Sequence, residues 1–275
     1  MSARRGWLFL LPLLVLLLGV FAVPVFEILR RAFVSDSGLT TAHFAALFSN
    51  DVFWTILART FAVALGTTVI CALLAYPYAY LMTIVSPRTR NLMLLVVMIP
   101  FWTSLIVRTY SWLVLLQDTG PIVSFLRGIG FSELTLIRTT AGVMIGMIQI
   151  LLPFMVLPLV NTLSTIDRRL LGAASVLGAR PVRAFTRVYV PLSLPGVFAG
   201  GVLVFILSLG FYITPVILGS PKNSLISQLI VQRVSERLDW GAGGAMSLVL
   251  FVLTLLVVGL SSRFVSVSKV YGGTT

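Results

Sequence analysis

Long stretches without charged side chains alternate with short polar connections along this chain. Six of the stretches are long enough to cross a membrane, because a helix rises about 1.5 Å per residue and about 20 apolar residues span the hydrocarbon core. They cover residues 7–26, 60–84, 92–116, 141–160, 194–218 and 242–260. None alternates as a membrane strand does, so the pattern predicts helices, whose backbone hydrogen bonds are made internally.

Composition agrees with this pattern. The chain has 275 residues, of which 58% are hydrophobic and 10% charged, and its mean hydropathy is +1.06. A soluble domain carries roughly 25% charged residues. We therefore predict an all-α, polytopic membrane protein with about six transmembrane helices, formed as a single domain over residues 1–275.

Two features limit the chemistry of the chain. Cys71 is its one cysteine and His43 its one histidine, so an intrachain disulfide and a zinc cluster of His and Cys ligands are excluded.

Arg4 and Arg5 precede the first apolar stretch, as in a signal peptide. That stretch is longer than a usual signal-peptide core and no small-x-small site follows promptly, so we expect a retained span.

The distribution of basic residues predicts the orientation. With the N-terminus inside, the inner segments hold eleven basic residues and one acid, Asp167, whereas the outer segments hold eight basic and seven acidic residues. Cytoplasmic loops carry an excess of Lys and Arg, so both termini are predicted to be cytoplasmic. The net charge of +12 then follows from topology and from contact with anionic lipid, and no nucleic-acid partner is expected.

The longest cytoplasmic connection, residues 161–193, has its own organisation. Asp167 favours a helix start and Gly178 a helix end, with Pro181 soon after. A second short helix is predicted from Pro181 to about residue 190. Ala173, Ala174 and Leu177 would lie on one side of a compact docking knob; the alternative is a basic amphipathic loop on lipid headgroups.

The spacing in this connection favours the first interpretation. Ala173-Ala174 is followed by three residues, then Gly178, nine residues, and Val188-Tyr189-Val190-Pro191. This resembles the cytoplasmic loop of permeases from binding-protein-dependent ABC importers. The family has a glutamate at the position that Gly172 occupies in this chain. The resemblance implies a type I ABC importer permease fold with cytoplasmic coupling helices. It implies an ATPase-coupling role for these residues: Arg168, Arg169, Ala173, Ala174, Leu177, Gly178, Arg180 and Pro181.

Other stretches resemble the spermidine/putrescine branch of that family. They are residues 76–79, 99–110, 150–158 and the pair Asp239-Trp240. The branch implies polyamine import across the bacterial inner membrane. It also implies a second, distinct permease, two ATPase subunits that bind ATP and Mg, and a periplasmic solute-binding protein. Nothing in this chain resembles a phosphate-binding loop, so no cofactor is expected in it.

Arg108 is a cation inside the third apolar stretch, where it costs at least about 2.5 kcal/mol and usually faces a partner or a water-filled path. It could bind an anionic substrate. It could instead be a structural or gating charge that pairs with Asp118 or snorkels, and we favour this second role. A polyamine path would use aromatic faces and carboxylates, for which the candidates are Trp102, Tyr110, Tyr212, Asp239 and Trp240; the alternative for the aromatic residues is an interfacial belt.

Small residues and prolines suggest how the helices pack. Gly142-xxx-Gly146 and Gly196-xxx-Gly200 permit close approach of helices. Pro77, Pro100, Pro153, Pro158, Pro195 and Pro215 are predicted to interrupt spans.

Three other functions compete with this prediction. An importer of anions or opine-like solutes would place Arg108 in the path. An intramembrane protease lacks the acids or the serine–histidine pair that it needs. A membrane scaffold would leave the regular spacing of the loop unexplained.

Overall fold

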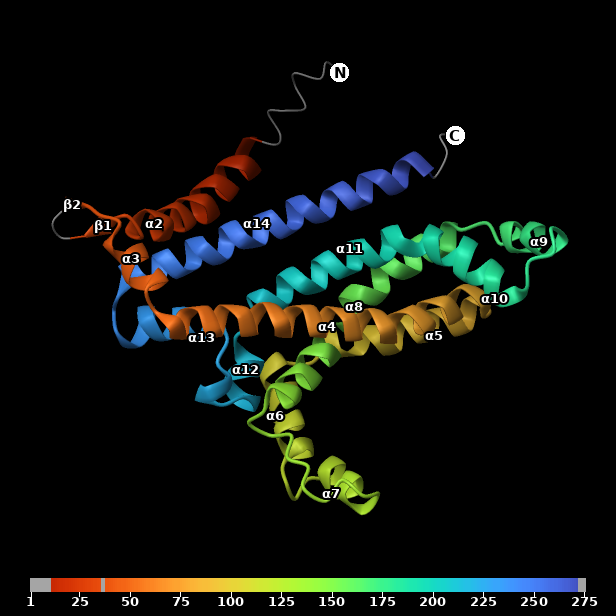
Figure 1. The fold of residues 1–275 in the computed structure, drawn as a ribbon, viewed down its shortest axis with the longest axis horizontal. Helices are drawn as coiled ribbons and strands as arrows, with labels where there is room; N and C mark the ends of the chain where they lie inside the picture. Colours follow the sequence, from red (N-terminus) through yellow and green to blue (C-terminus); the bar gives the residue numbers. More distant parts are fainter. Residues whose placement is uncertain (1–10, 36–37, 272–275) are drawn as a thin grey trace. The chain divides into compact units, whose positions relative to one another are not determined.

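The computed structural model describes residues 11–35 and 38–271, and nearly all of them are helical (Figure 1). The N-terminal elements are η1 (Leu18–Ala22), α2 (Val23–Arg31), strands β1 (Val34–Ser35) and β2 (Gly38–Leu39), and α3 (Ala42–Phe48). The central ones are α4 (Asp51–Ile84), α5 (Pro87–Met98), η2 (Ile99–Trp102), α6 (Leu105–Leu116), α7 (Pro121–Gly128) and α8 (Thr140–Thr165). The last are α9 (Arg169–Val176), α10 (Pro181–Ala184), η3 (Phe185–Tyr189), α11 (Val190–Leu209), α12 (Ile213–Leu218), η4 (Pro221–Asn223), α13 (Ile226–Val231), η5 (Gln232–Glu236) and α14 (Trp240–Tyr271).

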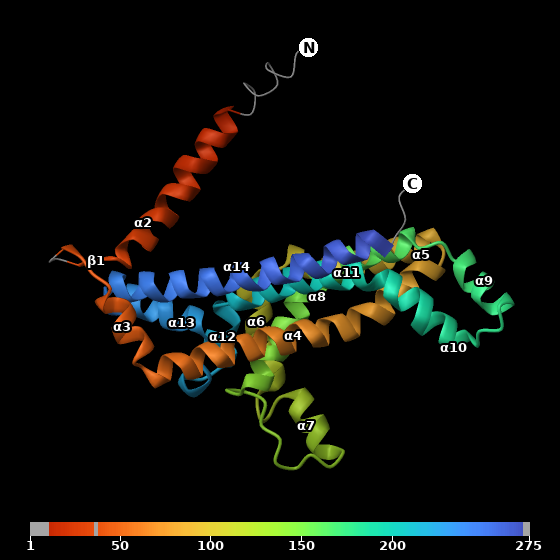
Figure 2. The same cartoon turned by 45° about the horizontal axis from the view of Figure 1, so that its top comes forward.

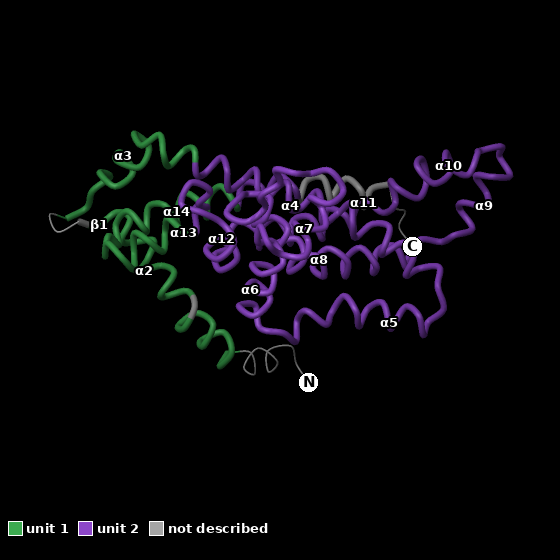
Figure 3. Tube along the Cα trace, turned by 90° about the horizontal axis from the view of Figure 1, so that it is seen from below, with its two compact units in different colours: residues 1–55, 228–254 green, residues 56–227, 255–275 purple. Residues whose placement is uncertain are grey.

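The chain divides into two compact units (Figure 3). Unit 1 comprises residues 1–55 and 228–254, and unit 2 comprises residues 56–227 and 255–275. The long helices α4 and α14 each contribute to both units. That the whole chain acts as one permease domain stays a prediction.

Within residues 11–35 and 38–271, five helices are long and apolar enough to cross a membrane: Leu11–Arg31, Asp51–Ile84, Thr140–Thr165, Pro181–Leu209 and Trp240–Ser261. A bent pair of helices, Pro87–Trp102 and Leu105–Gly128, passes the same test together and gives a sixth span if it counts as one. The predicted number of spans is therefore confirmed. Residues 7–10 of the first predicted span, with Arg4 and Arg5, lie outside the described residues.

The third predicted span, residues 92–116, is not one straight helix. Its two halves are bent by 97°. The break follows from Pro100, which lacks an N–H and tightens the chain into the short helix η2. Thr103 is then extended, and its hydroxyl donates to the Pro100 carbonyl at 2.9 Å. Hydropathy alone could not show this change of direction.

The fifth predicted span, residues 194–218, is also displaced. The helix begins at Pro181 and runs without a gap through η3 and α11 to Leu209, so the predicted separate helix from Pro181 to residue 190 does not exist. It ends at Gly210, and α12 starts after Tyr212. Pro77, Pro153, Pro158 and Pro195 lie inside continuous helices, so none of these four prolines ends its helix.

Helices α8 and α11 form the packed centre of unit 2, where Figures 1 and 2 show them side by side. A Cβ on Gly196 would lie 2.7 Å from the Thr162 side chain, and one on Gly200 would lie 2.7 Å from Met155 Sδ. Gly146 is equally crowded by Thr214 and Leu218 of α12. The predicted close approach is confirmed at these three glycines, whereas Gly142 faces the Leu136 carbonyl in the loop before its own helix.

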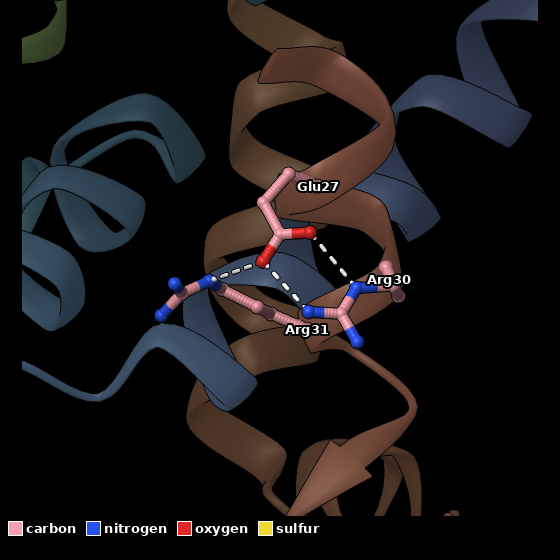
Figure 4. A network of polar contacts seen from close by, with 3 residues as sticks. All are labelled: Glu27, Arg30 and Arg31. Carbon is pink, nitrogen blue, oxygen red and sulfur yellow. Dashed lines mark hydrogen bonds and ion pairs between the residues drawn. The ribbon is translucent and has the colours of Figure 1, made fainter. Parts of the chain in front are cut away.

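A compact charged cluster ends the first span within unit 1 (Figure 4). The Glu27 carboxylate accepts from Arg30 Nε at 2.8 Å, from Arg30 Nη2 at 2.9 Å and from Arg31 Nε at 3.2 Å. The spacing of three and four residues on one helix brings these charges together. This carboxylate is therefore already neutralised by arginines of its own helix.

Candidate functional site

The predicted docking helix is α9, which lies with α10 at one end of unit 2 (Figure 2). Asp167 Oδ1 accepts from the Arg169 N–H at 2.9 Å, which satisfies a free amide at the start of the helix. At the other end, the Ala179 N–H donates to the Ala174 carbonyl at 3.0 Å. Gly178 has φ +83°, the left-handed conformation that ends a helix at little cost only for glycine. The predicted start and end of this helix are confirmed.

After this turn the chain re-enters a helix at once. Arg180 is extended and Pro181 occupies the first turn of α10, where its missing N–H costs nothing. On the other side of the segment, Arg168 Nη2 donates to Thr83 Oγ1 of α4 at 2.9 Å. The turn is thus joined to two membrane-length helices, α4 and the helix that begins at Pro181.

Apolar side chains on this segment face outward. Val176 is 89% exposed and Leu177 is 88% exposed, and Leu170 and Val182 are also exposed. We call these four residues the coupling patch. Exposed Arg168, Arg169, Arg180 and Arg183 flank it in sequence, and Asp167 is the one acid of the segment. Exposed apolar groups with a rim of one charge are typical of a protein-binding surface.

A pocket of about 500 Å³ lies beneath the segment. It is lined by residues of α4, α9 and the helix start at Pro181: Tyr80, Leu171, Gly172, Ser175, Pro181, Val182, Ala184 and Phe185. A Cβ on Gly172 would meet no atom within 4 Å. The position therefore has room for the glutamate that the resemblance places there.

An aromatic cluster, which the sequence did not predict, joins the same region to α4. Tyr80 meets Phe185 edge-on at 5.4 Å and Tyr189 at 5.3 Å between ring centroids, and Phe185 stacks on Tyr189. Tyr76 shares a hydrogen bond with Ser193 at 2.9 Å. The only available signal was the spacing of four residues within each pair, 76/80 and 185/189, which puts both members on one helix face.

Arg108 lines a cavity of about 240 Å³ in unit 2. The cavity walls are otherwise apolar: Phe101, Leu105, Ile150, Leu151, Phe154, Leu207 and Phe211. Arg108 Nε is buried there without a hydrogen-bond partner among the described residues. The predicted pairing with Asp118 is wrong, because Asp118 pairs with Arg127 at 2.8 Å after α7 folds the chain back.

The structure places the candidate path residues in two groups. Trp102 and Tyr110 are exposed on η2 and α6, and Tyr212 lies just before α12. Helices α6 and α12 meet through a shared hydrogen bond between Thr109 and Thr214 at 3.2 Å, so Tyr110 and Tyr212 flank one contact. Asp239 and Trp240 belong to unit 1.

The unit 1 candidates already have partners of their own. Arg233 Nη1 lies 3.7 Å from Asp239 Oδ2, and Asp239 Oδ1 accepts from the Ala242 N–H at 3.0 Å at the start of α14. The Arg31 guanidinium lies 5.2 Å from the centre of the Trp240 ring. An ammonium ion would have to compete with these arginines for the carboxylate and for the ring face.

Comparison with known proteins decides the family. Residues 75–269 match the family described as "Binding-protein-dependent transport system inner membrane component". The chain belongs to this family. The permease is 32% identical over 245 residues to the spermidine/putrescine transport system permease protein PotB of Haemophilus influenzae, covering 86% of this chain and 85% of that protein. It is 33% identical over 222 residues to PotB of Escherichia coli, covering 79% and 81%.

A solved structure shares the fold. A chain of a bacterial alginate ABC transporter, in complex with an alginate pentasaccharide-bound periplasmic protein, superposes with a TM-score of 0.74 at 19% identity and covers 94% of both chains. The predicted fold class is thereby confirmed. The permease is a multi-pass inner-membrane protein and a transport subunit, and the predicted absence of enzymatic function agrees with its family.

Proposed function

We propose that this permease forms part of the translocation path of an ATP-driven importer for polyamines. The relatives named above, whose names specify spermidine and putrescine, align over most of both chains. The spans themselves carry almost no carboxylate. Of the acids at span ends, Glu27 is held by Arg30 and Arg31, Asp239 pairs with Arg233, and Asp51 is the first residue of α4. Solute selection therefore falls mainly to an external binding protein, and the permease offers a transient path.

The coupling patch is the observation that carries the transport mechanism. It presents exposed Val176 and Leu177 on the turn at Gly178, with arginines on both sides. An apolar groove with an acidic rim on an ATPase subunit would match it in shape and charge. When two such subunits bind ATP and Mg and close, movement of α9 would pass to α4 through Arg168 and Thr83 and through the aromatic cluster around Tyr80.

The complete importer would then contain a second permease, two ATPases and a periplasmic binding protein. Both termini of this chain would lie in the cytoplasm, because that orientation puts the arginine-rich coupling segment on the same side as ATP. Trp102, Tyr110 and Tyr212 remain candidates for transient contact with the solute on the outer or central part of the path. Asp239 and Trp240 would take part only if Arg233 and Arg31 moved away from them.

ATPase activity of the reconstituted complex tests this function. Binding protein loaded with spermidine is expected to stimulate ATP hydrolysis, because the permeases would transmit the binding of the loaded protein to the ATPases. Unloaded binding protein and binding protein offered sulfate or an opine serve as controls. Stimulation by an anionic solute in place of spermidine would contradict the polyamine assignment and support the alternative importer.

Gly172 gives a prediction for the same assay. Gly172→Glu is expected to fold normally, because a side chain there meets open space. Because the proposed ATPase rim is acidic, a carboxylate beside the arginines of the segment should weaken ATPase binding, by less than about 1 kcal/mol for an exposed charge. The measurement is the amount of ATPase that co-purifies with the permease as salt is raised. Gly172→Gln, which adds similar volume without charge, is the control, and loss of ATPase with both variants would show that Gly172 must stay small for docking.

A further inference from the structure

The cavity at Arg108 lacks a group that the cation needs. The Nε atom is buried, it has no hydrogen-bond partner among the described residues, and the walls contributed by Phe101, Phe154 and Phe211 are apolar. Arg108 also lies in the first turn of α6, where the helix dipole adds positive potential. Arg108 as a whole is half-buried, and an anion beside its desolvated Nε would stabilise the guanidinium.

Unit 2 has no carboxylate left to supply that anion. Its acids are Asp118, Glu133 and Asp167. Asp118 pairs with Arg127 at 2.8 Å, and Asp167 accepts from the Arg169 N–H at 2.9 Å. Glu133 is exposed on the loop after α7. Among the described residues of unit 2, no carboxylate pairs with Arg108, so an anion for this cavity is expected from outside unit 2.

The surface next to the cavity is suited to a second membrane protein. On α6, Ile106, Val107, Tyr110 and Val114 are exposed apolar side chains on the turns around Arg108. Phe101 lines the cavity and is also 44% exposed, so the cavity reaches the surface there. A volume of about 240 Å³ accepts a single side chain. The headgroup of a phospholipid would have to bring two acyl chains past the phenylalanines.

We propose that the Arg108 cavity receives an aspartate or glutamate side chain from a transmembrane segment of the second permease subunit. The pair would be a charge-assisted hydrogen bond in a low-dielectric site, with the apolar face of α6 covered by the same neighbour. It would also neutralise Arg108, which would otherwise repel a polyamine cation. This inference rests on the proposed function only in requiring a permease pair.

The same argument determines the kind of partner. A second copy of this chain has no acid in the spans Thr140–Thr165, Pro181–Leu209 and Trp240–Ser261. Asp51 is the first residue of α4, and Asp118, between α6 and α7, pairs with Arg127. The acid at the end of its first span, Glu27, is held by Arg30 and Arg31. The partner is therefore a different chain that carries an acidic residue in a span.

Co-purification from membranes that express the whole complex tests the proposal without solute or nucleotide. Arg108→Met is expected to reduce the amount of second permease recovered with this chain by at least about tenfold, because it leaves a carboxylate unpaired in the membrane. Arg108→Lys should retain most of it. In the Arg108→Met background, changing one intramembrane acid of the second permease to its amide should restore recovery. Arg88→Met, which removes an exposed arginine from the first turn of α5, is the matched control.

The outcomes separate this proposal from the importer function. Full recovery of the second permease with Arg108→Met would overturn it, as would a loss that no acid-to-amide change restores. Purification of wild type as a complex of two identical chains would also overturn it. If Arg108→Met instead alters thermal stability only in nanodiscs that contain phosphatidylglycerol, the cavity binds lipid phosphate and the proposal is wrong. Failure to transport spermidine would leave the assembly result intact.

Discussion

Replacing Gly178 by valine is expected to reduce stimulation of the ATPase by loaded binding protein by at least about tenfold, since interactions that act as a unit are lost together. Gly178 has φ +83°, and a β-branched residue is strongly disfavoured there. No atom lies within 4 Å of an added Cβ, so the effect would come from the backbone and not from a clash. The turn would open and Val176, Leu177 and Arg180 would no longer face one partner together.

The matched control is Gly178→Asn. Asparagine adopts the left-handed conformation far more readily than valine and adds a side chain to the same open space. We expect it to keep most of the stimulation. Equal loss with both variants would mean that the position tolerates no side chain at the ATPase surface, whereas unchanged activity with Gly178→Val would remove the turn from the mechanism.

The second large effect is expected at the contact between α8 and α11. A Cβ on Gly200 would lie 2.7 Å from Met155 Sδ and 3.1 Å from the Met155 carbonyl oxygen. Gly200→Leu adds still more volume against backbone, and overpacking of this kind costs about 1–3 kcal/mol or more. We expect a lower melting temperature in detergent and a several-fold lower yield of folded permease.

Gly201 provides the comparison on the same helix. A Cβ there would meet only Thr68 Cγ2, at 3.6 Å, and the residue borders an apolar cavity of about 510 Å³. Gly201→Leu is therefore expected to keep the melting temperature near that of wild type. If Gly200→Leu were equally stable, the close packing of α8 on α11 would not be needed for the fold.

The parts of this fold that depend on neighbouring residues could be predicted from sequence. Asp167, Gly178 and Pro181 specify the start, end and restart of the helices around the turn at Gly178 through local hydrogen bonds and backbone conformation. The number of spans follows from the length of the apolar stretches. Each of these signals acts within a few residues or along one helix.

The parts of the fold that depend on partners distant in sequence could not be predicted from the sequence. Pro100 ends a helix while Pro77, Pro153 and Pro158 do not, because neighbouring packing decides whether a proline is accommodated. Asp118 forms its ion pair with Arg127 and not with Arg108, because the chain folds back at α7. The cluster of Tyr80, Phe185 and Tyr189 requires α4 to lie against η3, which no local pattern predicts.

Uptake of labelled spermidine into proteoliposomes is the most direct measurement of the central claim. The vesicles would contain this permease, the second permease and the ATPases, with ATP and Mg inside and binding protein outside. Accumulation that requires ATP hydrolysis, requires the binding protein and is lost with Gly178→Val is the predicted result. An assembled complex that hydrolyses ATP but accumulates no spermidine or putrescine, and imports an anionic solute instead, would contradict the assignment.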